Sequence, residues 1–201
     1  MAFHKDVLKI DPAAVTEELV SNLRRDVRQT LRRSGAVVGI SGGLDSSTVL
    51  ALCVRAFGPN RVVGVIMPEK ESSPDSTSLA RKLADQFGVE AVVEDVTGAL
   101  TGFGCYARRD EAIKRVFPEY DPGYKTKITL PGSLLDSDAL NVFYLTIITS
   151  EGKEKSKRLN LRDYLQIVAA SNFKQRSRMA MLYYQAELRN YAVIGTANKN
   201  E

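Results

Sequence analysis

The sequence is poor in the residues that most often carry metal or covalent chemistry. It has two cysteines, Cys53 and Cys105, which are far apart and show no Cys-x-x-Cys spacing, and a single histidine, His4. This arrangement predicts neither a zinc site nor a disulfide framework. Because His4 lies in a polar N-terminal stretch and has no second histidine to pair with, we expect no functional role for it.

Long hydrophobic runs and a strong charge of one sign are also missing. No run approaches the roughly 18 apolar residues of a membrane-spanning helix, and the N-terminus lacks the apolar core of a signal peptide. We therefore expect a cytoplasmic protein with no membrane partner. The formal net charge of +4 suits an anionic substrate but is too weak to indicate nucleic acid as a partner.

What the sequence does have is an alternation of helical and strand-like patterns joined by short links. This alternation predicts an α/β fold with a doubly wound, mostly parallel sheet. Buried strands are expected at residues 36–40, 61–67, 89–96 and 191–194, and helices at 12–33, from the loop after the first strand to 57, at 74–87 and at 173–188. In the first helix, Asp11 is the expected cap, Pro12 suits the first turn, and the predicted apolar face consists of Val15, Leu19, Leu23, Val27 and Leu31.

The pattern changes between residues 103 and 160, which we interpret as an insertion within a single domain of residues 1–201. It contains a turn-rich stretch at 117–123, a strong strand at 141–150 and a polar return strand at 153–159. Its charges at 153–158 suit a solvated edge strand. Because the chain ends on a loop just past a core strand, we expect the domain to continue beyond residue 201.

The loop after the first strand carries the clearest chemical signal. Gly42 and Gly43 allow a tight turn and a close backbone approach, and the following helix presents free N–H groups and the positive end of its dipole. The hydroxyls of Ser41, Ser46 and Ser47 add donors, so the loop suits phosphate. Its spacing matches neither a Walker A motif nor a Gly-x-Gly-x-x-Gly loop. A turn that is merely rich in small residues is the simplest alternative.

Asp45 argues against that alternative. A carboxylate in a phosphate-binding loop would repel the ligand unless a cation lies between them. Magnesium held by one or two carboxylates and by phosphate oxygens is the usual solution. The loop therefore predicts a site for a nucleotide with Mg²⁺.

The segment Ser41-Gly42-Gly43-Leu44-Asp45-Ser46 resembles the Ser-Gly-Gly-x-Asp-Ser signature of the PP-loop ATP pyrophosphatases. The resemblance implies an adenine nucleotide α-hydrolase-like fold and an enzyme that cleaves ATP between the α and β phosphates and transfers AMP to a substrate oxygen. Binding of ATP, the co-substrate, is then implied for Gly39, Ile40, Ser41, Gly42, Gly43, Leu44, Asp45 and Ser46. This signature does not identify the second substrate.

Two later segments resemble NAD synthetases. They are Asn172-Phe173-Lys174-Gln175-Arg176-Ser177-Arg178-Met179 and Gly195-Thr196-Ala197-Asn198-Lys199-Asn200-Glu201. Met67-Pro68 with Ser72-Ser73 is similar to the second sheet loop of that family. The resemblance implies that Arg176 contacts deamido-NAD, that Thr196 contacts ATP, and that Glu201 joins Asp45 on Mg²⁺. It further implies adenylation of the nicotinate carboxylate, attack by ammonia, and a homodimer.

Other functions stay open at this point. Another PP-loop amide ligase, a tRNA-thiolation enzyme and a non-catalytic nucleotide-binding module all fit parts of the pattern. A thiolation enzyme favours reactive cysteines, whereas Cys53 occupies a core position and Cys105 has no visible partner, although it could be exposed. Ammonia is the expected nitrogen donor because 201 residues hold no glutaminase domain, which leaves room for a separate glutaminase subunit.

Overall fold

The computed structural model describes residues 9–130 and 143–197. The chain divides into two compact units, Met1–Thr97 with Arg178–Glu201, and Gly98–Ser177. The longest helix, α6 (Leu161–Arg189), contributes its first part to the second unit and its last part to the first. The predicted insertion at 103–160 lies inside the second unit, which also includes the start of α6.

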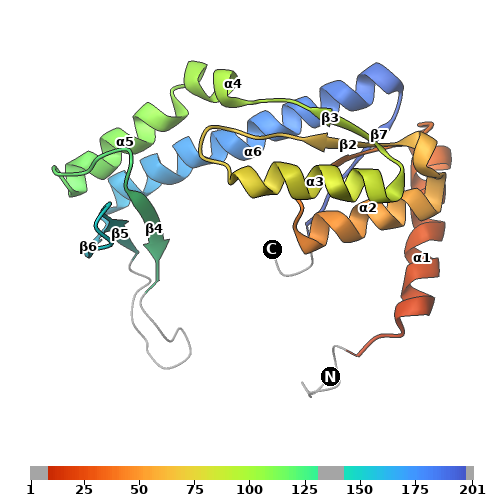
Figure 1. Cartoon of the computed structure of the whole chain (residues 1–201), viewed down its shortest axis with the longest axis horizontal. Helices are drawn as coiled ribbons and strands as arrows, with labels where there is room; N and C mark the ends of the chain where they lie inside the picture. Colours follow the sequence, from red (N-terminus) through yellow and green to blue (C-terminus); the bar gives the residue numbers. More distant parts are fainter. Residues whose placement is uncertain (1–8, 131–142, 198–201) are drawn as a thin grey trace. The chain divides into compact units, whose positions relative to one another are not determined.

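The first unit contains the predicted parallel sheet, with strand order β3-β2-β1-β7 (Figure 1). Its strands are β1 (Ala36–Gly39), β2 (Val62–Ile66), β3 (Glu90–Val93) and β7 (Ala192–Ile194). All three pairings are parallel, and Val38 lies opposite Gly64 on one side and Ile194 on the other. The doubly wound α/β prediction is confirmed.

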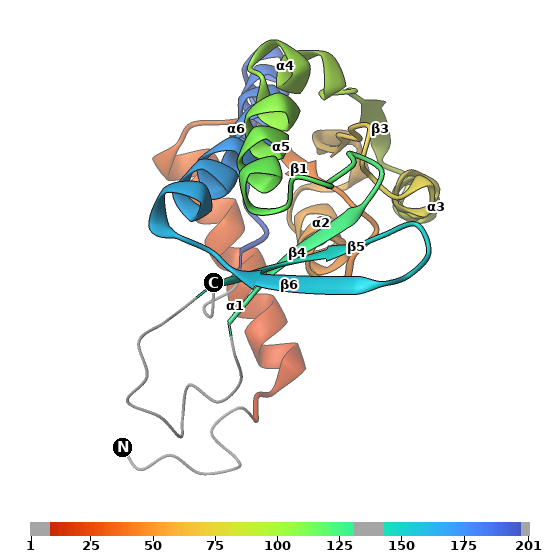
Figure 2. The ribbon, with the colours of Figure 1, turned by 90° about the vertical axis from the view of Figure 1, so that its left-hand side faces the viewer.

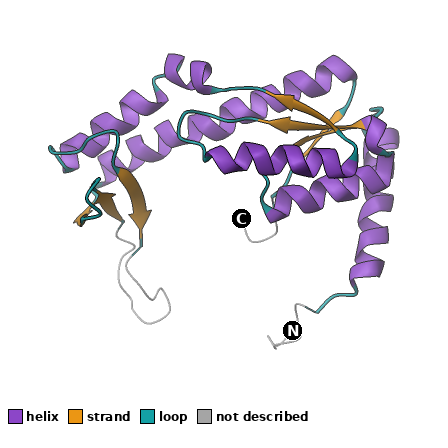
Figure 3. Cartoon of the chain, in the orientation of Figure 1, coloured by secondary structure: helices purple, strands orange, loops and turns teal. Residues whose placement is uncertain are grey.

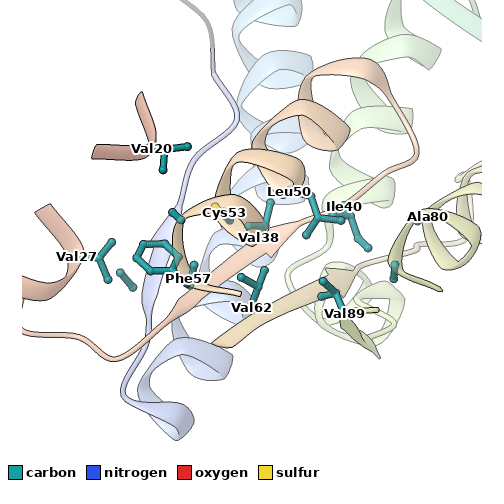
Figure 4. Close-up of a cluster of buried hydrophobic side chains, with 14 of the residues drawn as sticks. Val20, Val27, Val38, Ile40, Leu50, Cys53, Phe57, Val62, Ala80 and Val89 are labelled. Atoms are coloured by element: carbon teal, nitrogen blue, oxygen red, sulfur yellow. The ribbon is translucent and has the colours of Figure 1, made fainter. Parts of the chain in front are cut away.

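Helices cover both faces of this sheet, which explains why β1 and β2 are continuous apolar runs. On one face pack α1 (Pro12–Arg25), α2 (Leu44–Phe57) and α3 (Pro74–Phe87), with buried Val38, Ile40, Leu50, Cys53 and Val62 between them (Figure 4). On the other face, Val37, Val63 and Val65 pack with Ala186 of α6. Figure 3 shows the strands among these helices.

The first helix begins as predicted, but its buried face agrees only in part with the predicted one. Asp11 Oδ1 accepts hydrogen bonds from the backbone of Ala13 and Ala14 at 3.0 and 3.2 Å, and α1 continues as a π-helical segment, η1 (Asp26–Thr30). Val27 of the predicted face is buried, but so is Val20, which was not predicted, whereas Leu19 and Leu31 of the predicted face are 42% and 55% exposed. That part of the prediction is wrong because residues four apart advance about 40° around a helix at each step, so a long series leaves the buried face.

Short elements complete the first unit. A 3₁₀ turn, η2 (Pro59–Arg61), joins α2 to β2 after Gly58, which adopts a φ of +80° and ends α2. Gly88 ends α3 in the left-handed conformation, as its position after Phe87 predicts.

The second unit contains an antiparallel sheet of order β4-β5-β6 (Figure 2). Its elements are α4 (Thr97–Gly102), α5 (Cys105–Val116), β4 (Lys125–Thr129), β5 (Tyr144–Ile148), β6 (Glu154–Arg158) and the first part of α6. The predicted hairpin is confirmed by β5 and β6, and the exposed β6 is its polar strand. The core of the second unit includes the buried side chains of Phe117, Leu145, Ile147 and Ile167.

Asn160 and Arg115 both bind Asp163 at the beginning of α6 within this unit. The Asn160 side chain accepts a hydrogen bond from the backbone N–H of Asp163 at 2.9 Å and donates one to the Asp163 carboxylate at 2.7 Å. The Arg115 guanidinium of α5 also binds this buried carboxylate at 2.8 Å. Together these contacts fix the α6 N-terminus against α5. In the described part of the chain, no helix combines the length and apolar character needed to cross a membrane.

Candidate nucleotide site

The glycine- and serine-rich loop lies at the carboxyl end of β1, between the ends of β2 and β7. Ile40 extends the strand by donating its backbone N–H to Val65 O at 2.9 Å, and α2 begins at Leu44. Ligands of open parallel sheets bind at this edge. No described side chain caps α2, whose N-cap residue is Gly43, so the first backbone N–H groups of the helix are available to an anion.

Gly42 sets the path of the loop. Its φ is +79°, and a Cβ added there would lie 2.7 Å from Leu79 Cβ and 3.3 Å from the backbone nitrogen of Ala80. Gly42 is therefore required twice, once for its left-handed backbone and once for its contact with α3. Gly43, by contrast, has an ordinary φ of −80°.

The buried Ser46 side chain stabilises the loop by hydrogen bonds to its backbone. Its side chain is buried, donates to Gly43 O at 3.0 Å and accepts the backbone N–H of Ser41 at 3.3 Å. Ser47 donates to the same Gly43 carbonyl at 2.8 Å, and Ser41 Oγ accepts the N–H of Gly43 at 3.3 Å. The three hydroxyls thus bind the loop backbone, and the buried Ser46 has a structural role that the sequence did not reveal.

Asp45 lies in the first turn of α2 with an exposed carboxylate. Magnesium needs only one or two protein carboxylates when substrate phosphates supply further oxygens, so this carboxylate beside a phosphate loop fits the ion. Within residues 9–130 and 143–197, no group of three or more His, Cys, Asp or Glu side chains is placed to hold a metal. Glu201, the predicted second ligand, lies outside the described residues, so the paired metal site stays a prediction.

Thr196 follows β7, the strand that pairs with β1 on the side away from β2. Val38 lies opposite Ile194, so continuing this register brings Thr196 level with Ile40, where the loop begins. The structure therefore brings Thr196 to the same sheet edge as the Gly39–Ser46 segment. Thr196 is half-buried.

The two arginines of the later motif differ in their surroundings. Arg176 is exposed and belongs to the second unit, so its position relative to the loop is not defined. Arg178 belongs to the first unit, is half-buried, and donates Nε–H to Met67 O at 3.3 Å. This difference agrees with the expectation that residues two apart on a helix diverge.

Glu69 is a buried charge that sequence reasoning did not single out. It follows β2 at the same sheet edge, and its carboxylate accepts the backbone N–H of Glu71 at 3.0 Å. Its own N–H donates to Ser72 Oγ at 3.0 Å, which closes the loop before α3. The sequence feature that could have drawn attention to Glu69 is its position as an acidic residue only a few residues after a buried strand.

Both cysteines are buried. Burial raises the pKa of the Cys53 thiol to about 12, and Cys105 Sγ donates to Ala170 O at 3.2 Å. The expectation that Cys105 could be exposed is wrong, because α5 turns this residue toward α6. A thiol with a pKa near 12 is protonated at neutral pH and is a weak nucleophile.

Comparison with known proteins agrees with this geometry. The NAD synthase family model matches residues 15–116 and 139–201, and the unmatched residues between them fall within the predicted insertion. NH(3)-dependent NAD(+) synthetases of Mesorhizobium japonicum and Rhizobium meliloti are 47% and 45% identical over 97% and 100% of this chain. The chain spans 61% and 60% of the lengths of these two relatives.

The fold is also similar to that of a solved structure. An NH3-dependent NAD synthetase from Campylobacter jejuni, determined in complex with the nitrate ion, superposes with a TM-score of 0.60 at 23% identity. The match covers 96% of this chain and 59% of that one. The family model and the two relatives confirm the resemblance to NAD synthetases that residues 172–179 and 195–201 suggested, and the chain belongs to the NAD synthase family.

Proposed function

We propose that this chain carries the nucleotide site of an ammonia-dependent NAD synthetase, a ligase that forms a carbon–nitrogen bond. In the first step, a nicotinate carboxylate oxygen of deamido-NAD attacks the α-phosphate of ATP, and pyrophosphate leaves. In the second step, ammonia attacks the carbonyl carbon of the acyl-adenylate, and AMP leaves to give NAD. Neither step needs a covalent enzyme nucleophile.

The observation that carries the proposal is the loop at the carboxyl end of β1. It combines the uncapped N-terminus of α2, the turn at Gly42 and an exposed carboxylate at Asp45. A helix N-terminus favours an anion, whereas Asp45 would repel one without a cation. A Mg²⁺–nucleotide satisfies both features, which a merely structural turn would not require.

Each candidate residue then has a role in the reaction. The backbone amides of the Gly39–Ser46 segment bind the ATP phosphates, Thr196 donates to the nucleotide from the loop after the neighbouring strand β7, and Arg176 binds deamido-NAD. Asp45 and Glu201 hold Mg²⁺, which would neutralise charge on the leaving pyrophosphate. The loop amides are oriented before the reaction, so their contribution is electrostatic.

Two observations bear on the alternatives and on the nitrogen donor. Buried Cys53 and Cys105 argue against a thiolation enzyme that uses either thiol. The named relatives are NH(3)-dependent enzymes, which supports free ammonia as the donor here. A separate glutaminase could still supply that ammonia, and we expect the enzyme to act in the cytoplasm, where ATP is abundant.

Exposed apolar side chains on α6 support the homodimer that the family resemblance implies. Met179, Tyr183, Tyr184 and Leu188 are each more than half exposed. They form two pairs spaced four residues apart, Met179 with Tyr183 and Tyr184 with Leu188, so the members of each pair lie side by side on the helix surface. Burying these side chains against a second copy would remove them from water, and sedimentation velocity would show a dimer.

The decisive experiment compares Asp45→Asn with Asp85→Asn in the whole protein that contains this chain. Asp85 is also an exposed aspartate, but it lies near the C-terminal end of α3, where the proposal assigns no metal. We expect Asp45→Asn to abolish ammonia-dependent NAD formation at an unchanged melting temperature, and Asp85→Asn to retain activity. Full magnesium-dependent activity in Asp45→Asn would refute the proposed site.

A further inference from the structure

Arg178 occupies the carboxyl edge of the first unit's sheet, and the position of α6 explains why. The helix reverses into β7 through a turn in which Tyr191 N–H donates to Ala186 O at 2.8 Å, so α6 runs antiparallel to the strands. Ala186 packs among Val37, Val63 and Val65 in the middle of the sheet. Moving one turn back along α6 therefore moves toward the carboxyl ends of the strands.

That turn contains Leu182, which packs at the end of β1. A Cβ added at Gly39 would lie 3.5 Å from both Leu182 Cδ atoms and 3.2 Å from Met67 Cε. Arg178 lies one turn further back and donates Nε–H to Met67 O at 3.3 Å, just past the end of β2. Its guanidinium is thus held where the strands end, on the face opposite α2.

The guanidinium has unused donors in this position. An arginine has five N–H donors, and within the described residues the bond to Met67 O is its one hydrogen bond or ion pair. The side chain is half-buried, so it is restrained and incompletely hydrated. The Nη groups of a restrained fork are well suited to phosphate oxygens.

The reaction needs a cation on the α6 side of the sheet, where Arg178 lies. An anionic carboxylate must approach an anionic α-phosphate, while Asp45 and the α2 amides lie on the other face of the strand end. We propose that the Arg178 Nη groups bind the α-phosphate of ATP and keep that contact in the acyl-adenylate. This inference rests on the proposed function and adds a nucleotide contact distinct from the deamido-NAD contact assigned to Arg176.

The test compares Arg178→Met with Arg24→Met in the whole protein. Arg24 also binds backbone carbonyls, through Nε to Ala56 O at 2.9 Å and Nη2 to Arg55 O at 2.8 Å, but it joins α1 to α2. It therefore controls for the loss of an arginine–carbonyl contact between elements. Titration calorimetry measures the binding of ATP, AMP and adenosine.

We expect Arg178→Met to weaken binding of ATP and AMP by about 10- to 150-fold and to leave adenosine binding unchanged, because only the phosphate contact is lost. Arg24→Met should change none of the three affinities. Arg178→Lys keeps the charge without the fork, so intermediate losses for ATP and AMP are expected. This second variant provides the measurement if Arg178→Met fails to fold.

Equal AMP affinities in the wild type and in a folded Arg178 variant would overturn the inference, as would a matching loss for adenosine. Either result leaves the proposed function intact if wild-type protein binds ATP and Asp45→Asn lacks activity. If wild-type protein fails to bind Mg²⁺–ATP, the proposed function itself fails. The two ideas are therefore separable in one set of titrations.

Discussion

The backbone at Gly42 gives the sharpest test of the loop. Gly42→Ala places a residue with a Cβ at φ +79° and brings that atom to 2.7 Å from Leu79 Cβ. The left-handed conformation costs a non-glycine residue about 1–2 kcal/mol, and overpacking typically costs about 1–3 kcal/mol. The free energy of unfolding should therefore fall by about 2–5 kcal/mol, which lowers the melting temperature by about 4–20 °C in a chain of this size.

Gly43→Ala is the matched control. Gly43 has a φ of −80°, and among the described residues an added Cβ would meet only Ser41 Oγ, at 3.3 Å. Alanine at this N-cap position should cost less than about 1 kcal/mol. Thermal unfolding of both variants without nucleotide isolates the backbone effect from ligand binding. Equal melting temperatures for Gly42→Ala and Gly43→Ala would refute the assignment of Gly42 as a conformationally required residue.

Three further predictions concern other parts of the chain. Arg176→Ala should raise the apparent Michaelis constant for deamido-NAD by about 10- to 150-fold and should have little effect on that for ATP. The control Arg162→Ala, at another exposed arginine, should change neither constant. Equal effects on both constants would assign Arg176 a structural role. Asp163→Ala should lower the free energy of unfolding, measured by urea titration, by about 2–4 kcal/mol, because it leaves the partly exposed Arg115 without its buried partner. A loss under about 0.5 kcal/mol, which is the scatter of surface substitutions, would contradict this prediction. The raised pKa of Cys53 keeps its thiol neutral in the native state, so between about pH 9 and 12 the unfolded chain releases a proton that the native chain retains. The free energy of unfolding of the wild type should therefore fall with rising pH by about 1.4 kcal/mol per pH unit more than that of Cys53→Ala. Identical slopes for the two proteins would be inconsistent with this burial effect.

The parallel sheet was predictable because its central strands, β1 and β2, are buried on both faces and so appear as short apolar runs. Several other elements, α4, α5, β4 and the first part of α6, were not. β4 consists of Lys125 to Thr129, a polar stretch that forms a strand because it pairs with β5, which lies beyond an intervening segment. The first part of α6 was missed because this helix contacts two different cores, so its apolar residues do not form a single stripe.

The candidate site was predictable to a similar extent. Glycines beside a carboxylate indicated the phosphate loop, since both features are local in sequence. The burial of Ser46 and the bond from Arg178 to Met67 O depend on packing, and the latter joins residues 111 positions apart. No local pattern reports such a contact, so only the fold revealed it.

The position of β7 in the sheet has a consequence for how the protein folds during synthesis. β1 pairs with β7 on its outer side, and this contact is continued by Ser34, whose hydroxyl donates to Asn190 O, 156 residues further along the chain. Until the ribosome has released that distant segment, β1 exposes a row of unpaired backbone groups, which is a template for aggregation. We therefore expect folding to be limited by a late, long-range strand addition, and nascent chains that stop before β7 to require chaperone protection.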